Sequence, residues 1–156
     1  MTTDTAVTVE EQQLVVFDLG TESYGVDIET VREIIRMQEI TKMPGTPAYV
    51  QGVINLRGKV TPVVDLRARF GLPVTEFTKD SRIVVVDINK QSIGAIVDAV
   101  TEVLRISTEA VEPPSSVVTS EDSGYITGIV KLPERLIILL DLARALSDDE
   151  VTGLAA

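Results

Sequence analysis

An internal repeat constrains the fold of this chain more than any other feature of its sequence. A shift of 69 positions aligns identical residues: Val15 with Val84, Gly25 with Gly94, Glu33 with Glu102 and Arg36 with Arg105. A shift of 76 positions aligns a further set: Tyr49 with Tyr125, Gly52 with Gly128 and Asp65 with Asp141. The chain therefore holds two copies of one pattern of roughly 65–70 residues, and the second copy is longer by a segment before Tyr125.

Each copy opens with an apolar strand and closes with a strand that ends in Asp-Leu. The opening strands are predicted over residues 14–19 and 83–88, where β-branched side chains dominate. Asp65 and Asp141 stand at positions typical of a helix N-cap, which predicts brief helices over 67–70 and 143–146. Segments 28–37 and 97–106 are compatible with a helical turn or with an irregular strand.

Short strands separated by glycine and proline turns indicate a mainly β protein built from small barrels. One copy alone would bury too little apolar surface to be stable. We therefore expect the two copies to share an apolar seam and to fold as one unit. Pro62 lies within a predicted strand, and proline cannot donate to a sheet ladder, so this strand is expected to be an edge strand or to bulge there.

The charge and the missing residue types exclude several classes of function. The net charge is −10, whereas a nucleic-acid-binding protein needs a basic footprint, so neither nucleic acid nor an anionic membrane is an expected partner. The chain has no Cys and no His, which removes thiolate nucleophiles, the commonest general base and the commonest metal ligand.

Neither a signal peptide nor a membrane span is predicted. Residues 1–13 are polar and acidic, unlike a signal peptide, and are expected to be a flexible segment. The longest apolar run, 136–140, is too short to span a bilayer. These features predict a cytoplasmic protein without direct membrane insertion.

Patterns of catalytic residues are not convincing. Asp122-Ser123-Gly124 resembles half of an aspartic-protease motif, but it occurs once and in polar surroundings, which favours a turn. Asp18 and Asp87 end apolar strands as a receiver's phosphoacceptor would, without the other acidic residues and βα pattern of a receiver. The sequence therefore predicts a protein that is not an enzyme and holds no metal and no cofactor. A small hydrolase working with paired carboxylates is the remote alternative.

The two copies differ at residues 55–58, and this stretch carries a family resemblance. The first copy reads Gly52-Val53-Ile54-Asn55-Leu56-Arg57-Gly58 and then Pro62-Val63-Val64-Asp65-Leu66, while the second has Lys131-Leu132-Pro133-Glu134 in place of residues 55–58. The other motifs are Tyr24-Gly25-Val26-Asp27-Ile28, Val31-Arg32-Glu33-Ile34 and Val97-Asp98-Ala99-Val100. Together these motifs are similar to the signature of the CheW-like domain family, and the resemblance covers residues 14–146.

The resemblance implies two pseudo-symmetric, five-stranded SH3-like barrels with a few short helices. It implies one CheW-like domain over 14–148, made of two intertwined subdomains over roughly 14–75 and 76–148, and a C-terminal tail over 149–156. It also implies a scaffold that binds the cytoplasmic tips of methyl-accepting chemotaxis receptors and the regulatory domain of the histidine kinase CheA, and that reaches membrane receptor arrays through these partners. A similar scaffold for surface motility or second-messenger output is the alternative.

The resemblance also places the coupling of receptor and kinase at particular residues: Arg57, Glu33, Val31, Ile34, Val100 and Val103. Arg57 lies in a Leu-Arg-Gly turn, where it either meets a partner or organises the turn by bonding backbone carbonyls or Glu33. Glu33 is either a receptor contact or an ordinary solvated acid. The four apolar residues fit core packing or a groove between the halves that receives a receptor helix.

Four glycines are expected to have structural roles at turns. These are Gly52, Gly58, Gly94 and Gly128. Each is expected either to have a positive φ or to sit where another group packs closely.

Overall fold

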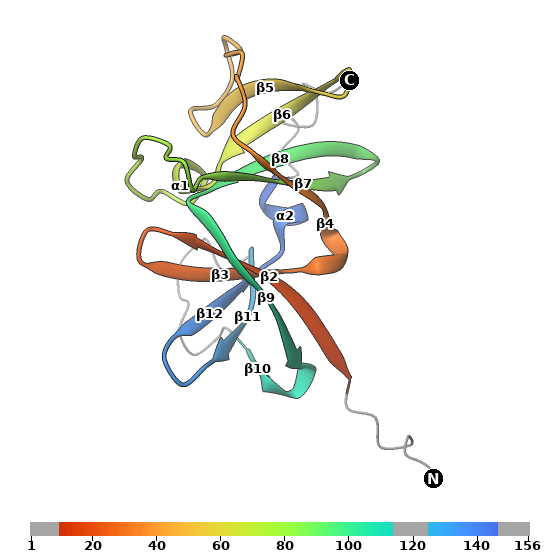
Figure 1. The fold of residues 1–156 in the computed structure, drawn as a ribbon, viewed down its shortest axis with the longest axis vertical. Helices are drawn as coiled ribbons and strands as arrows, with labels where there is room; N and C mark the ends of the chain where they lie inside the picture. Colours follow the sequence, from red (N-terminus) through yellow and green to blue (C-terminus); the bar gives the residue numbers. More distant parts are fainter. Residues whose placement is uncertain (1–9, 114–124, 147–156) are drawn as a thin grey trace.

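The computed structural model describes residues 10–113 and 125–146, and its strands form two mixed sheets (Figure 1). The six-stranded sheet has the order β10 (Val111–Glu112), β11 (Ile126–Lys131), β12 (Leu136–Leu140), β3 (Glu22–Asp27), β2 (Glu11–Leu19) and β9 (Ala99–Ser107). The five-stranded sheet has the order β4 (Val31–Arg36), β7 (Arg82–Ile88), β8 (Gln91–Val97), β6 (Lys59–Asp65) and β5 (Val50–Leu56). The short helices are η1 (Ile28–Thr30), α1 (Leu66–Arg69), η2 (Thr108–Ala110) and α2 (Leu142–Leu146).

The prediction of a mainly β protein with two small barrels and a few short helices is confirmed. One sheet has six strands rather than the expected five because the two-residue strand β10 adds to the edge of β11. The segment 28–37 divides into η1 and β4, and the segment 97–106 lies almost wholly in β9. β2 begins at Glu11, earlier than the expected residue 14. The turn at 122–124 and the tail at 149–156 lie outside the described residues.

The two sheets do not follow the two copies of the sequence, because each copy gives its opening hairpin to the other copy's sheet. β2 and β3 of the first copy pair with β9 and β12 of the second. β7 and β8 of the second copy pair with β4 and β6 of the first. The parallel contacts are equivalent by the repeat, since Leu139 pairs with Gly25 and Val63 with Gly94. The subdomain limits of 14–75 and 76–148 stay a prediction about the sequence copies.

The opening strands are buried on both faces, which explains why their apolar runs do not alternate with polar residues. In β2, Leu14 and Val16 face the interior of the six-stranded barrel, whereas Val15 and Phe17 face a second cluster. This second cluster, which we call the shared seam, joins buried residues of both sheets. Its largest members include Phe17, Leu19, Leu66, Ile93 and Leu146. The predicted apolar seam between the halves is therefore confirmed.

The two short helices begin at equivalent aspartates. Asp65 Oδ1 accepts a hydrogen bond of 3.0 Å from the Arg67 N–H, and Asp141 Oδ1 accepts one of 3.2 Å from the Arg144 N–H. Both caps satisfy N–H groups that lack a partner within the helix. The helices begin at Leu66 and Leu142, one residue before the predicted starts.

The expectation that Pro62 marks an edge strand or a bulge is wrong. Its strand, β6, lies between β8 and β5 in the five-stranded sheet. Pro62 pairs regularly with Val53 of β5, and the bulge lies in β5 between Val50 and Gly52. Pairing of β6 with β8 begins only at Val63. The missing N–H of Pro62 therefore interrupts no ladder to β8, which is why an interior strand tolerates a proline.

Candidate functional site

The hairpin turn between β5 and β6 holds Arg57 in an unusual backbone conformation. Leu56 pairs with Lys59, which leaves Arg57 and Gly58 as a two-residue loop with φ angles of 51° and 86°. Positive φ at both central residues is the requirement of a type I′ turn. The Gly58 N–H donates to Asn55 Oδ1 at 2.8 Å. Glycine adopts this conformation easily, whereas a left-handed conformation costs a residue such as arginine about 1 kcal/mol.

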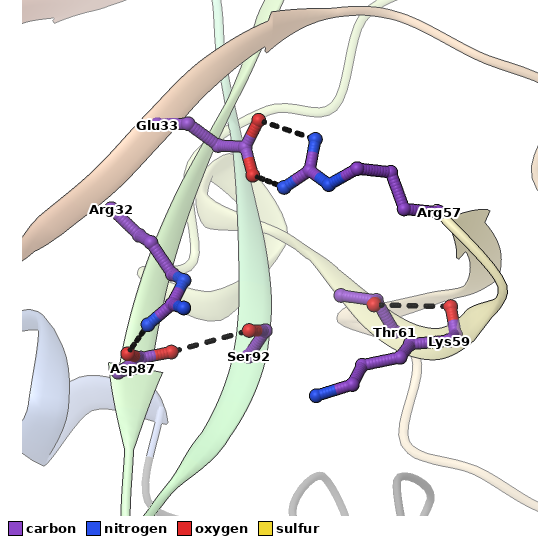
Figure 2. A network of polar contacts seen from close by, with 7 residues as sticks. All are labelled: Arg32, Glu33, Arg57, Lys59, Thr61, Asp87 and Ser92. Atoms are coloured by element: carbon purple, nitrogen blue, oxygen red, sulfur yellow. Dashed lines mark hydrogen bonds and ion pairs between the residues drawn. The ribbon is translucent and has the colours of Figure 1, made fainter.

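From this turn the Arg57 side chain reaches across to Glu33 on β4 (Figure 2). Arg57 Nη1 donates to Glu33 Oε1 at 3.1 Å, and Nη2 pairs with Oε2, so the contact is bidentate. β4 and β5 are the two edges of the five-stranded sheet. The ion pair therefore spans the open side of the barrel.

The two partners of this ion pair differ in exposure. The Arg57 side chain is 68% exposed and the Glu33 side chain is 24% exposed. The hydrogen bond from Arg57 lowers the pKa of Glu33, and the same hydrogen bond raises the pKa of Arg57. Both groups therefore keep their charges at neutral pH. They form a charged, accessible pair that fits recognition of a partner, and the low pKa does not suit Glu33 to donate a proton.

Strand β4 has a β-bulge at Arg32, directly before Glu33. Val31 lies opposite Val86 and Glu33 opposite Val85, so Arg32 is the extra residue of the strand. Arg32 pairs with Asp87 at the end of β7. A bulge of this kind re-aims side chains at a sheet edge. The edge of β4 consequently presents two arginine–carboxylate pairs, as Figure 2 shows.

The second copy carries an equivalent acid–arginine pair that the sequence did not reveal. Glu102 on β9, the counterpart of Glu33, pairs with Arg135 just before β12. The position equivalent to Arg57 is Pro133, so a position-by-position comparison of the copies misses this pairing. β9 also has an equivalent bulge, in which Thr101 is the extra residue and donates to the Val16 carbonyl at 3.2 Å.

The four apolar residues predicted for coupling divide into two kinds. Val31 and Val100 are half-buried and pack against the shared seam. Ile34 and Val103 are 39% and 52% exposed, and they occupy equivalent positions on β4 and β9. The structure thus favours core packing for the first pair, while the second pair is accessible. Their assignment to receptor or kinase contact stays a prediction.

Two further exposed apolar residues escaped the sequence reasoning. Val60, at the start of β6, is 58% exposed and Leu136, at the start of β12, is 48% exposed. They are equivalent under the shift of 76 positions. Val60 follows the turn that contains Arg57, and Leu136 directly follows Arg135. Each barrel therefore has an exposed apolar residue close in sequence to an arginine of an ion pair.

The four selected glycines lie at turns or close approaches. Gly58 has a positive φ and open space around it. Gly52 has a φ of 150°, and a Cβ there would lie 2.2 Å from the Thr41 carbonyl oxygen. Gly94 and Gly128 have side chains of Ile83 and Val111 against them, so a Cβ would lie at 2.6 and 2.4 Å.

Within residues 10–113 and 125–146, no group of three or more acidic residues is arranged to hold a metal ion. In the same part of the chain, no helix is both long enough and apolar enough to cross a bilayer.

Comparisons with known proteins find one family. The family model described as CheW-like domain matches residues 13–150. A protein named chemotaxis protein CheW from Treponema pallidum is 36% identical, covering 96% of this chain and 91% of its own. The protein of the same name from Klebsiella aerogenes is 34% identical, covering 90% and 84%. The crystal structure of the scaffolding protein TtCheW from Thermoanaerobacter tengcongensis is similar with a TM-score of 0.82 and 42% identity, covering 90% and 96%.

Proposed function

The chain belongs to the CheW-like domain family, and we propose that it is a chemotaxis adaptor that couples the cytoplasmic tips of chemoreceptors to the histidine kinase CheA. The observation that carries this proposal is the match to proteins named chemotaxis protein CheW over most of both chains. The similarity to the crystal structure of TtCheW, a scaffolding protein, supports the same role. In this role the chain is not an enzyme and works in the cytoplasm, carried to receptor arrays by its partners.

The adaptor acts by binding two partners through separate surfaces. Binding of one partner then affects binding of the other through a coupling free energy between the two sites, and no covalent step is needed. On the five-stranded barrel, the exposed Arg57–Glu33 pair and the accessible Ile34 support a contact with the receptor tip or the kinase. Buried aromatic or arginine anchors typically dominate such contacts. On the six-stranded barrel, Val103 is the corresponding accessible residue.

Titration calorimetry tests the adaptor function directly. The protein is titrated with the isolated regulatory domain of CheA and, separately, with a receptor signalling fragment. We expect saturable binding to both partners and activation of CheA when all three are mixed. Failure to bind either partner at high protein concentration would contradict the proposal.

The Arg57→Ala variant tests whether the turn takes part in coupling. We expect about a tenfold loss of kinase activation, because a partner contact through the guanidinium is removed. Arg57→Asn is a second variant, since an Asn-Gly turn suits the left-handed conformation and keeps the hairpin folded. Arg135→Ala is the matched control, because it removes the equivalent pair from the other barrel. An unchanged activation by both Arg57 variants would exclude this turn from coupling.

A further inference from the structure

The two short helices have apolar residues at equivalent positions, but arginine and alanine exchange places between them. α1 and the residue after it read Leu66-Arg67-Ala68-Arg69-Phe70, and α2 reads Leu142-Ala143-Arg144-Ala145-Leu146. The leucines at the start are fully buried in both helices. The positions of Arg67 and Arg69, however, are alanines in α2. The repeat therefore places two arginines on one side of the molecule only.

Arg67 connects the five-stranded barrel to the six-stranded barrel. Its Nε and Nη2 donate to the Asp98 carboxylate at 2.9 and 2.5 Å, and its Nη1 donates to the Pro73 carbonyl at 2.8 Å. Asp98 lies between β8 and β9, where the chain crosses from one sheet to the other. Its Oδ2 also accepts a hydrogen bond of 2.8 Å from the Gly20 N–H in the β2–β3 turn. The Arg67 side chain is only 15% exposed, so water screens this pair less than a surface pair.

Arg69 makes the second connection between the barrels. Its guanidinium carbon lies 4.9 Å from the centre of the Tyr49 ring and 4.8 Å from that of the Tyr125 ring. These tyrosines are equivalent by the repeat, so the guanidinium lies between symmetry-related rings. Arg69 Nε also donates to the Ala145 carbonyl at 2.9 Å, and Nη2 donates to the Tyr125 hydroxyl. Ala145 is the counterpart of Arg69 and is fully buried, which leaves no room there for a second arginine.

Both arginines start from α1, which follows β6 of the five-stranded sheet, and their partners include Asp98, where the chain crosses between the sheets, and Tyr125, just before β11 of the six-stranded sheet. The shared seam also joins the two barrels, but apolar contact is not directional. A bidentate ion pair and a guanidinium held against aromatic rings, by contrast, fix an orientation. The two connections are therefore directional contacts between the barrels.

We propose that Arg67 and Arg69 form a one-sided brace that holds the two barrels at a fixed angle, and that they act as positioning residues for signal transfer between the partner-binding surfaces. The second part of this proposal rests on the proposed function, because it assumes that receptor and kinase bind surfaces separated by the seam. Loss of the brace leaves each partner-binding surface intact and allows the angle between the two barrels to vary. Binding to each partner separately is then preserved, while the response of the kinase to the receptor is lost.

Spin labels can measure the angle without any partner, because the chain contains no Cys. Val60→Cys and Leu136→Cys place labels at equivalent, exposed positions of the two barrels. Double electron–electron resonance then gives the distribution of distances between the barrels. We expect one narrow distribution for the otherwise unaltered protein and a broader or shifted one for Arg69→Ala and for Asp98→Asn. Arg105→Ala is the control, since its exposed pair with Glu11 lies within the six-stranded sheet.

The same variants without labels are then compared in binding and in kinase assays. We expect affinities for the isolated partners within about twofold of those of the unaltered protein, and a clear loss of receptor control over the kinase. A merely structural role would lower the unfolding temperature without broadening the distance distribution of the folded protein. Unchanged distances in both variants would overturn the brace. Broadened distances with an intact kinase response would overturn the positioning role.

The brace and the adaptor function are tested independently of each other. The distance measurement uses the free protein, so it decides the brace even if neither partner binds. An unaltered protein that binds no partner would overturn the adaptor function and, with it, the positioning role.

Discussion

The Arg57 turn and the Arg135 turn hold the same kind of ion pair on equivalent strands, yet their arginines lie in different surroundings. Arg57 occupies a left-handed turn position and exposes about twice as much of its side chain as Arg135 does. Arg135 also donates to the Ser23 hydroxyl at 3.2 Å. The comparison shows that closing a barrel does not require a strained arginine at the hairpin tip. In the first copy the arginine has the less favourable left-handed conformation, and its guanidinium is more accessible to a partner.

Substitution of equivalent glycines should have the largest effect on stability and should differ between the copies. Gly52→Ala brings a Cβ against the Thr41 backbone, where two hydrogen bonds of 2.9 Å join Thr41 to Val53. We expect a loss of about 3 kcal/mol or more in the free energy of unfolding. Gly128→Ala should cost about 1–3 kcal/mol, because the nearest atom belongs to the Val111 side chain on a short edge strand that can shift.

Chemical denaturation of both variants measures this difference. Equal losses would show that the two copies close their barrels with the same tolerance. That result would contradict the distinction between a backbone and a side-chain neighbour at these glycines.

Asp98→Asn should have a smaller effect that depends on pH. The hydrogen bond from Arg67 lowers the pKa of Asp98 below the ordinary value of 3.8. A carboxylate with a lowered folded pKa stabilises the protein fully above its unfolded pKa, and this stabilisation is lost as the pH falls through the folded pKa. We expect Asp98→Asn to cost about 1–2 kcal/mol at neutral pH and to make the decline in stability below pH 3.8 shallower.

Glu29→Gln is the matched control for this prediction. Glu29 is the exposed counterpart of Asp98, and the equivalent helix has Ala143 in place of Arg67. At neutral pH the free energy of unfolding should therefore be nearly the same for Glu29→Gln and the unaltered protein. If Asp98→Asn keeps the full acid decline, another group is responsible for it. Asp65 does not contribute to such a decline, because burial raises its pKa and acidification relieves the cost of its charge.

The smallest effects on stability are expected at the two exposed ion pairs. Arg57→Ala should leave the free energy of unfolding nearly unchanged, because solvent screens the pair. Arg135→Ala should cost about 1 kcal/mol, since the less exposed arginine also loses its hydrogen bond to Ser23. Thermal unfolding at low and high salt checks both values. A larger loss for Arg57→Ala than for Arg135→Ala would reverse the comparison between the turns.

The repeat in the sequence predicted much of the fold, because equivalent residues of the two copies have equivalent structural roles. Asp65 and Asp141 cap helices in both copies, and the opening strands include the predicted residues 14–19 and 83–88. The exchange of hairpins between the copies did not follow from the sequence. A strand's side-chain pattern reports how many of its faces are buried, and it does not identify the strand that pairs with it.

The candidate site was predictable only in part. Arg57 and Glu33 were expected to be possible partners, and the structure joins them. Arg135 was missed because the second turn places its arginine at a different position, so the repeat shift of 76 positions aligns Arg57 with Pro133 instead. The contacts of Arg67 and Arg69 connect residues far apart in the sequence, and no local pattern indicates them. Pro62 lies in an interior strand against expectation, because pairing with β8 begins only at the next residue and needs no N–H from Pro62.

The exchange of hairpins also determines the order in which the protein can be completed during synthesis. The last strand of the five-stranded sheet ends at Val97, so all of that sheet has been synthesised before β9, which begins at Ala99. The first hairpin, β2 and β3, must wait for β9 and for β12, which ends at Leu140. The residues made first are therefore the last to gain their neighbours. During that interval only the face of the hairpin that belongs to the shared seam has apolar partners available, on β7 and β8.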